Sequence, residues 1–178
     1  MQQRRSVFAV PRHRWCRLEA EISFQLGKDL PPRATAYTSE EIIGAIASCH
    51  PAIEEFEAGV VNPAKVARFK MIGDLQMHGG FVHGPAVPDW QEIDFAKESV
   101  PLLVDGSIRM ERNGSNTGGT DLLRLVLYLA NEGVARTGGL KRGGWITTGS
   151  WTGNTVASAG SLVKVCFSAA GGVSLRFG

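Results

Sequence analysis

Apolar and polar residues alternate without a break between positions 18 and 26. Every second residue from Leu18 to Leu26 is apolar, and the residues between them are Glu19, Glu21, Ser23 and Gln25. A period of two is typical of a β-strand that buries one face and keeps the other polar. This predicted strand, over about residues 15–26, constrains the fold because the rest of the chain must cover its apolar face.

The two glutamates of this stretch fall on the same face of the predicted strand. A rise of about 3.3 Å per residue places Glu19 and Glu21 about 6.5 to 7 Å apart at Cα. Two carboxylates at that spacing can converge on one metal ion. The same alternation also arises on the wet face of an antiparallel sheet, so the periodicity leaves a metal site and a solvated face both open.

Length and composition indicate one globular domain. The chain has 178 residues, of which 43% are hydrophobic and 20% charged, with 22 glycines and 8 prolines that favour turns over long helices. We expect an irregular N-terminal segment over residues 1–14 and a single catalytic-like domain over residues 15–178. A net charge of +2 with mostly dispersed basic residues argues against nucleic acid as a partner.

The cysteines and the apolar runs indicate a cytoplasmic protein. Cys16, Cys49 and Cys166 are odd in number, have no metal-like spacing and lie among apolar neighbours, so we expect buried, reduced thiols. No apolar run approaches the roughly 18 to 20 residues that span a bilayer, and the N-terminus lacks a secretory cleavage pattern. We therefore expect no membrane association. The histidines show no zincin spacing.

Helix signals occur twice. Thr38 and Glu41 form a possible capping box for a helix that continues to Ala47 and ends by His50, before a proline. Thr120 is a candidate N-cap for a second helix, which Gly138-Gly139 would end. Residues 62–71 fit a loop or a short helix equally well.

The remaining segments predict strands. Asp105-Gly106 between alternating apolar residues is the signal for a type I′ hairpin. Further extended segments are expected over residues 51–57, 79–85, 145–148, 161–168 and 173–177. The predicted fold class is mainly β with a few helices (α+β).

Several motifs follow one another in a characteristic order. They are LEAEISFQLGKDL at 18–30, PAIE at 51–54, GD at 73–74, GFVHG at 80–84, LYLAN at 127–131, GGLKRG at 138–143 and ITTGSWTG at 146–153. In this order they resemble the C-terminal catalytic domain of the fumarylacetoacetate hydrolase superfamily, in its 2-keto-4-pentenoate hydratase and 4-oxalocrotonate decarboxylase branch. The resemblance covers about residues 15–178 and implies a twisted, mixed β-roll with small helices outside.

The resemblance also implies a metal site. The three acidic ligands of the family fall on Glu19, Glu21 and Glu54 of this sequence. A site made only of carboxylate oxygens favours Mg²⁺ or Mn²⁺. In the family an α-keto acid chelates the ion, which stabilises the dienolate that forms during the reaction.

Further residues of the site follow from the same resemblance. Asp74 matches an acid near the active site of relatives, which implies a catalytic role, with a salt bridge as the alternative. Thr147, Thr148 and Gly149 match a loop that approaches the substrate carboxylate, for which hydroxyl and backbone N–H donors are suited.

The implied function is a metal-dependent hydratase (hydro-lyase) acting on a 2-hydroxy-dienoate or 2-keto-enoate, such as 2-keto-4-pentenoate, in the catabolism of aromatic compounds. Decarboxylation or C–C bond hydrolysis within the same superfamily remains an alternative. Relatives carry a further N-terminal part with a lysine-containing motif, which this chain lacks before the first strand, so a non-catalytic subunit is also open. Expected partners are the small α-keto acid substrate and either a second copy in a homo-oligomer or a decarboxylase/hydratase partner subunit.

Overall fold

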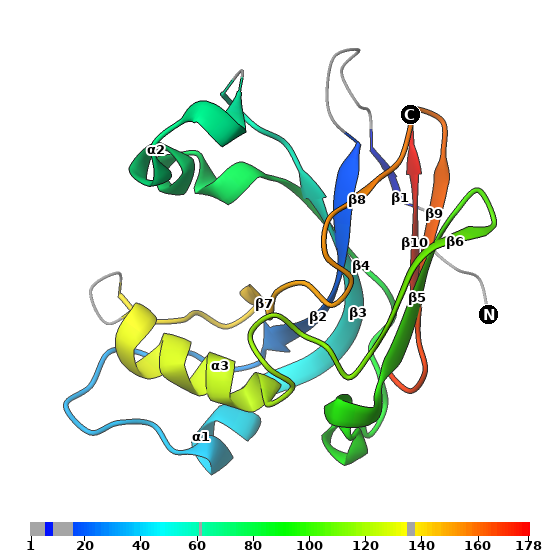
Figure 1. The fold of residues 1–178 in the computed structure, drawn as a ribbon. Helices are drawn as coiled ribbons and strands as arrows, with labels where there is room; N and C mark the ends of the chain where they lie inside the picture. Colours follow the sequence, from blue (N-terminus) through cyan, green and yellow to red (C-terminus); the bar gives the residue numbers. More distant parts are fainter. Residues whose placement is uncertain (1–5, 9–15, 61, 135–137) are drawn as a thin grey trace.

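The computed structural model describes residues 6–8, 16–60, 62–134 and 138–178, which fold into two β-sheets with short helices at their edges (Figure 1). The prediction of a mainly β chain with a few helices is confirmed. Within the segment expected to be irregular, Ser6–Phe8 form strand β1; the rest of residues 1–14 lies outside the described residues.

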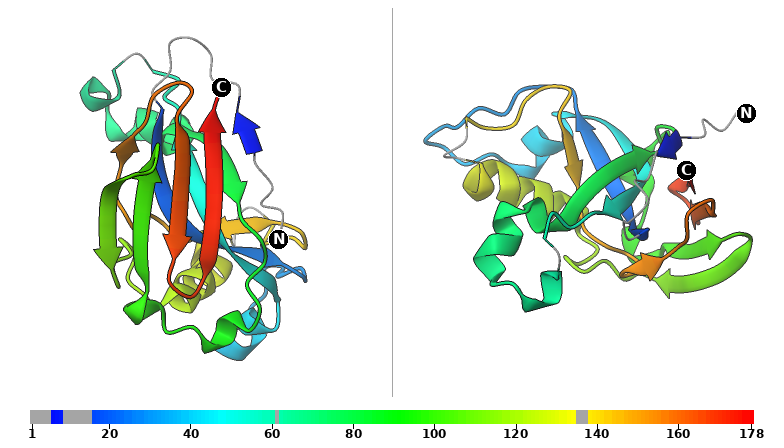
Figure 2. Two further views of the ribbon diagram at one scale, coloured as in Figure 1. Left: turned by 90° about the vertical axis from the view of Figure 1, so that its right-hand side faces the viewer. Right: turned by 90° about the horizontal axis from the view of Figure 1, so that it is seen from above.

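The first sheet is built by the C-terminal strands and a central hairpin. Its order is β1-β10-β9-β5-β6, and Figure 2 shows these strands side by side in the left view. The bounds are Gly171–Phe177 for β10, Leu162–Phe167 for β9, Ser99–Val104 for β5 and Ser107–Asn113 for β6. Asp105 and Gly106 have φ of 50° and 82°, which is the left-handed geometry of the expected type I′ turn.

The second sheet carries the alternating stretch. Its order is β4-β3-β2-β7, and a short strand β8 also pairs with β2. The bounds are His78–His83 for β4, Ile46–Phe56 for β3, Arg17–Leu26 for β2, Trp145–Thr147 for β7 and Thr155–Val156 for β8. The even-numbered residues of β2 are buried in one continuous core, which also takes in apolar residues of β5, β9 and β10. The apolar residues of the alternating stretch therefore face the core, as the sequence predicts.

In the described residues, three α-helices flank the sheets: α1 at Ser39–Ile43, α2 at Arg68–Gly73 and α3 at Leu122–Tyr128. Single turns lie at Pro63–Lys65, Leu75–Met77, Trp90–Glu92 and Phe95–Lys97, and a π-helical turn, Leu129–Gly133, continues α3. Figure 1 shows α1 beside α3 at the lower end of the molecule, whereas α2 lies at the upper end, away from both. None of the helices in the described ranges is long and apolar enough to cross a membrane.

Several local predictions need correction. The capping box of Thr38 and Glu41 is present, but α1 ends at Ile43, and Ile46 already begins β3, because pairing with β2 outweighs the helix preference of a short apolar run. Asp121, not Thr120, caps α3, and its helical turns end at Gly133, before Gly138-Gly139. Cys166 is exposed, while Cys16 and Cys49 are buried.

Candidate metal centre

Strand pairing brings three glutamates together on one face of the second sheet. Antiparallel register places Glu19 of β2 directly opposite Glu54 of β3, and Glu21 follows on the same face of β2. One carboxylate oxygen from each of the three lies within 4.8 Å of the others. No other group of three potential metal ligands occurs among the residues that the structure describes.

This face of the sheet is not a solvated one. The Glu21 side chain is buried, with 1% of its surface exposed, and Glu19 and Glu54 are half-buried. Burial, followed by the nearby charge of Glu54, raises the pKa of Glu21 from 4.5 to about 9. Burial also raises the pKa of Glu19, partly offset by a hydrogen bond from Ser150. The charged forms of Glu19 and Glu21 are thus disfavoured, mainly by burial, and a bound cation would reverse this effect.

The end of β7 and the loop that follows it hold the Glu21 side chain in place. The Thr147 hydroxyl donates a hydrogen bond to Glu21 Oε2, and the Gly149 N–H donates to the same oxygen at 3.1 Å. Gly149 has φ of 92°, a conformation that favours glycine. Two of the three residues expected to approach the substrate carboxylate, Thr147 and Gly149, therefore form hydrogen bonds with a glutamate of the cluster.

Thr148 points away from the cluster. Its hydroxyl donates to the Ile22 carbonyl at 2.9 Å, and its side chain is buried. The alternation of a strand explains this difference, because Thr147 and Thr148 project to opposite faces. The substrate contact expected of Thr148 does not match this orientation.

A cavity of about 960 Å³ opens over the three glutamates. Thr147, Gly149 and Ser150 line it, together with a mainly apolar group that comprises Phe56, Met71, Leu75 and Met77. Its volume lies in the range of small-molecule sites. The combination of an acidic floor and apolar walls suits a small acid with a carbon chain.

Asp74 does not line this cavity. It ends α2, and its Oδ2 accepts a hydrogen bond from the Gly59 N–H at 3.0 Å. The structure therefore brings together Glu19, Glu21 and Glu54 with Thr147 and Gly149, and leaves Asp74 outside this group. Its catalytic role stays a prediction.

One histidine that the sequence analysis did not place reaches the cluster. His78 Nδ1 lies 2.7 Å from Glu54 Oε1. The only signal in the sequence is its position just before Gly79-Gly80, at the start of the strand that pairs with β3. The two other described histidines, His50 and His83, pack their rings against Trp145 instead.

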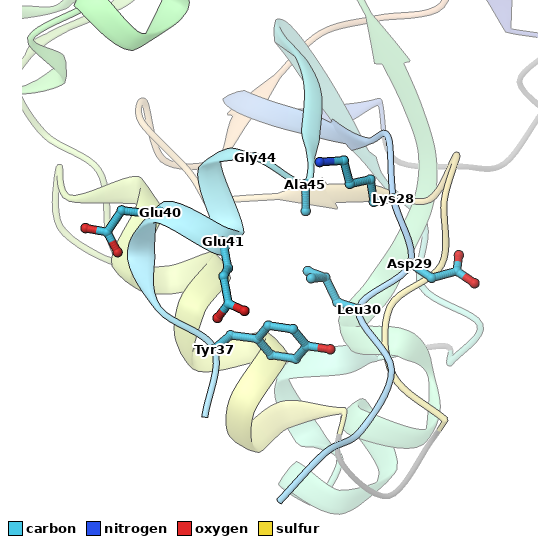
Figure 3. A pocket seen from close by; sticks show the side chains of 8 residues that line it. All are labelled: Lys28, Asp29, Leu30, Tyr37, Glu40, Glu41, Gly44 and Ala45. Atoms are coloured by element: carbon cyan, nitrogen blue, oxygen red, sulfur yellow. The ribbon is translucent and has the colours of Figure 1, made fainter. Parts of the chain in front are cut away.

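A second hollow, of about 420 Å³, lies between α1 and the segment that follows β2 (Figure 3). Two acidic groups of its lining have partners: the Asp29 carboxylate accepts from the Arg142 N–H at 2.7 Å, and Glu41 forms an ion pair with Arg33. Figure 3 shows Glu41 directed toward Tyr37, while Asp29 points away from the hollow. This hollow offers no convergent set of free ligands.

Comparisons with known proteins identify the fold. No family model matches the sequence, and no curated protein does. Among solved structures, 4-oxalocrotonate decarboxylase from Pseudomonas putida G7, complexed with calcium and acetate, is similar with a TM-score of 0.72 and 23% identity over 90% of this chain. The same enzyme complexed with magnesium and adipate gives the same TM-score and identity.

Two further structures agree. A fumarylacetoacetate hydrolase family protein from Yersinia pestis CO92 has a TM-score of 0.68 at 19% identity, covering 95% of this chain and 75% of its own. Maleylpyruvate hydrolase from Sphingobium sp. SYK-6 has a TM-score of 0.64 at 17% identity, covering 96% and 58%. The chain spans 59% of the decarboxylase structure. It has the fold of the fumarylacetoacetate hydrolase family, and that prediction is confirmed.

Proposed function

We propose that this chain forms the metal-binding catalytic unit of a hydro-lyase that adds water to a 2-hydroxy-dienoate or 2-keto-enoate, with 2-keto-4-pentenoate as a representative substrate. The observation that carries the proposal is the convergence of Glu19, Glu21 and Glu54 on one partly buried spot at the floor of a cavity. The reaction belongs to the breakdown of aromatic compounds, the setting expected from the sequence.

The donor set fits a hard divalent cation. Glu19, Glu21 and Glu54 would hold it through oxygen atoms alone, and such a set favours Mg²⁺ or Mn²⁺ over softer metals. The raised pKa of Glu21 supports this assignment, because a carboxylate that is buried and lies close to a second carboxylate is stabilised by an opposing charge. A cation bound there would supply Lewis-acid polarisation of an α-keto acid. The decarboxylase with the same fold is complexed with calcium in one solved structure and with magnesium in another.

The protein groups around the glutamates would orient the ligand set and exclude water. Thr147 and Gly149 hold the buried Glu21 carboxylate, which leaves little freedom for it to rotate. Met71, Leu75 and Met77 line the same cavity and would cover the carbon chain of the substrate. A partly apolar cavity also strengthens electrostatic interactions within it.

Decarboxylation or C–C bond hydrolysis is the second candidate. Proteins with this fold include a decarboxylase and a hydrolase, and all of these reactions can start from the same chelated α-keto acid. The three candidates differ in their products: a hydroxy-keto acid, carbon dioxide or two shorter acids. Product analysis therefore separates them.

Calorimetry of Mg²⁺ and Mn²⁺ binding, with and without oxalate as a stand-in for the α-keto acid, tests the proposal. We expect saturable binding that oxalate strengthens and that Glu21→Ala abolishes. Glu111→Ala is the matched control, since Glu111 is an exposed glutamate of β6 in the other sheet. Absence of metal binding by the folded wild-type protein would overturn the proposal. Where binding occurs, NMR of the products from 2-hydroxypenta-2,4-dienoate then identifies the reaction.

A further inference from the structure

The pairing of β3 with β4 contains an irregularity next to the three glutamates. Glu54 pairs with Phe81 and Glu55 with Gly80, but Phe56 pairs with His78, so that Gly79 has no partner. This is a β-bulge, which re-aims the side chains that follow it. Without it, His78 would lie on the face opposite to Glu54 and Phe81, because residues of a strand alternate between faces.

Two further features accompany the bulge. Gly79 lies close to the end of β3 and to the residue that follows it: a Cβ atom at this position would lie 2.3 Å from Glu57 Cβ, so only glycine fits there. The three residues before His78, Leu75, Gln76 and Met77, all have positive φ, at 50°, 54° and 70°. Such conformations are unfavourable for residues with a side chain. Strained backbone of this kind commonly accompanies functional sites.

The result of this geometry is a hydrogen bond between His78 and the cluster. His78 Nδ1 lies 2.7 Å from Glu54 Oε1, with the imidazole about 41% exposed and the Glu54 side chain about 17% exposed. A carboxylate that binds a metal ion is ionised and only accepts hydrogen bonds, so in the metal-bound site Nδ1 would be the donor. A donor fixed on one oxygen of a carboxylate also sets the plane of the group, and with it the direction of the other oxygen.

We propose that His78 is a positioning residue that orients the Glu54 carboxylate for metal binding. The inference rests on the proposed function, since it concerns the same metal centre. Glu21 is held by Thr147 and Gly149, and Glu19 receives a hydrogen bond from Ser150. His78 gives Glu54 the corresponding support, so that each of the three glutamates has a donor that sets its orientation. Outer partners of this kind typically change metal affinity by about 10- to 100-fold.

The test measures Mg²⁺ affinity at one fixed pH for the wild-type protein, His78→Ala, His78→Asn and His83→Ala. His83 is the matched control, because it is an exposed histidine of the same strand. We expect His78→Ala to weaken Mg²⁺ binding about 10- to 100-fold. His78→Asn should recover most of the affinity, because its amide N–H can replace the Nδ1 donor. His83→Ala should bind like the wild type.

Thermal unfolding without added metal provides the second readout. If His78 had a purely structural role, His78→Ala would unfold at a lower temperature, and His78→Asn would not recover the Mg²⁺ affinity. The inference alone is overturned if His78→Ala binds Mg²⁺ within about twofold of the wild type, or if His78→Asn binds no better than His78→Ala. If the wild-type protein binds no metal, the proposed function and this inference both fall. If His78→Ala does not fold, the comparison of His78→Asn with the wild type decides.

Discussion

Replacement of Glu21 by a residue that cannot ionise should make the unfolding free energy depend less on pH when no metal is bound. The pKa of Glu21 rises in the folded protein from 4.5 to about 9, mainly through burial and then through the charge of Glu54. A carboxyl group with a raised pKa favours the folded state while it is protonated. Its contribution is fully present below about pH 4.5 and is lost as the pH rises through about 9.

The expected magnitude follows from this shift. Between pH 5 and pH 7 the unfolded chain ionises at this position, while the folded protein keeps the proton. With ~1.4 kcal/mol for each pKa unit, the wild-type protein loses roughly 2.5 kcal/mol of unfolding free energy over this interval. Glu21→Gln stays neutral at every pH and should not show this part of the loss.

Urea denaturation in the presence of EDTA, at several pH values between 5 and 8, measures the difference. Glu111→Gln is the matched control and should follow the wild type. Excess Mg²⁺ should restore the stability of the wild type near pH 7, because a cation favours the ionised carboxylates, and should do so much less for Glu21→Gln. Parallel pH profiles of the wild type and Glu21→Gln would refute the reasoning.

Three further predictions concern the scaffold, and urea denaturation checks each of them. Glu98 is buried and accepts hydrogen bonds from the Ser168 hydroxyl and from the N–H groups of Ala169 and Ala170. Glu98→Ala should lower the unfolding free energy by about 2 to 4 kcal/mol, because buried donors lose their acceptor. Glu98→Gln should lower it less. Gly106→Val should cost about 1 to 2 kcal/mol, because φ at this turn is 82°; an unchanged stability would contradict the turn geometry. Phe24→Ala should cost about 3 to 5 kcal/mol, since Phe24 is fully buried against Trp90; a loss below about 1 kcal/mol would show that this part of the core is loosely packed.

Local features of the sequence were sufficient where the decisive interactions lie within a few residues. The period of two in residues 18–26 places Glu19 and Glu21 on one face of β2, and Asp105-Gly106 specifies its hairpin. The capping box at Thr38 and Glu41 also forms as predicted. Backbone sterics and nearest-neighbour hydrogen bonds determine these features before any long-range contact exists.

The length of α1 was not determined locally. Residues 42–47 carry apolar side chains that suit a helix or a strand, and the pairing of Leu26 with Ile46 gives the second half to β3. The resemblance to a family assigned Glu54, but the residues alone could not distinguish it from Glu55 and Glu57. Antiparallel register with β2 makes that choice, because it places Glu54 opposite Glu19.

His78 shows most clearly what depends on the tertiary structure. In a regular strand its side chain would lie on the face opposite to Glu54, and the only signal of the bulge in the sequence is the pair Gly79-Gly80. The close contact between Gly79 and Glu57 and the pairing of Phe56 with His78 turn it toward the cluster. The sequence by itself therefore determined the strand β2 and two of the three carboxylates of the cluster, Glu19 and Glu21. The tertiary structure decided which other side chains join them, because strand register is set by long-range packing.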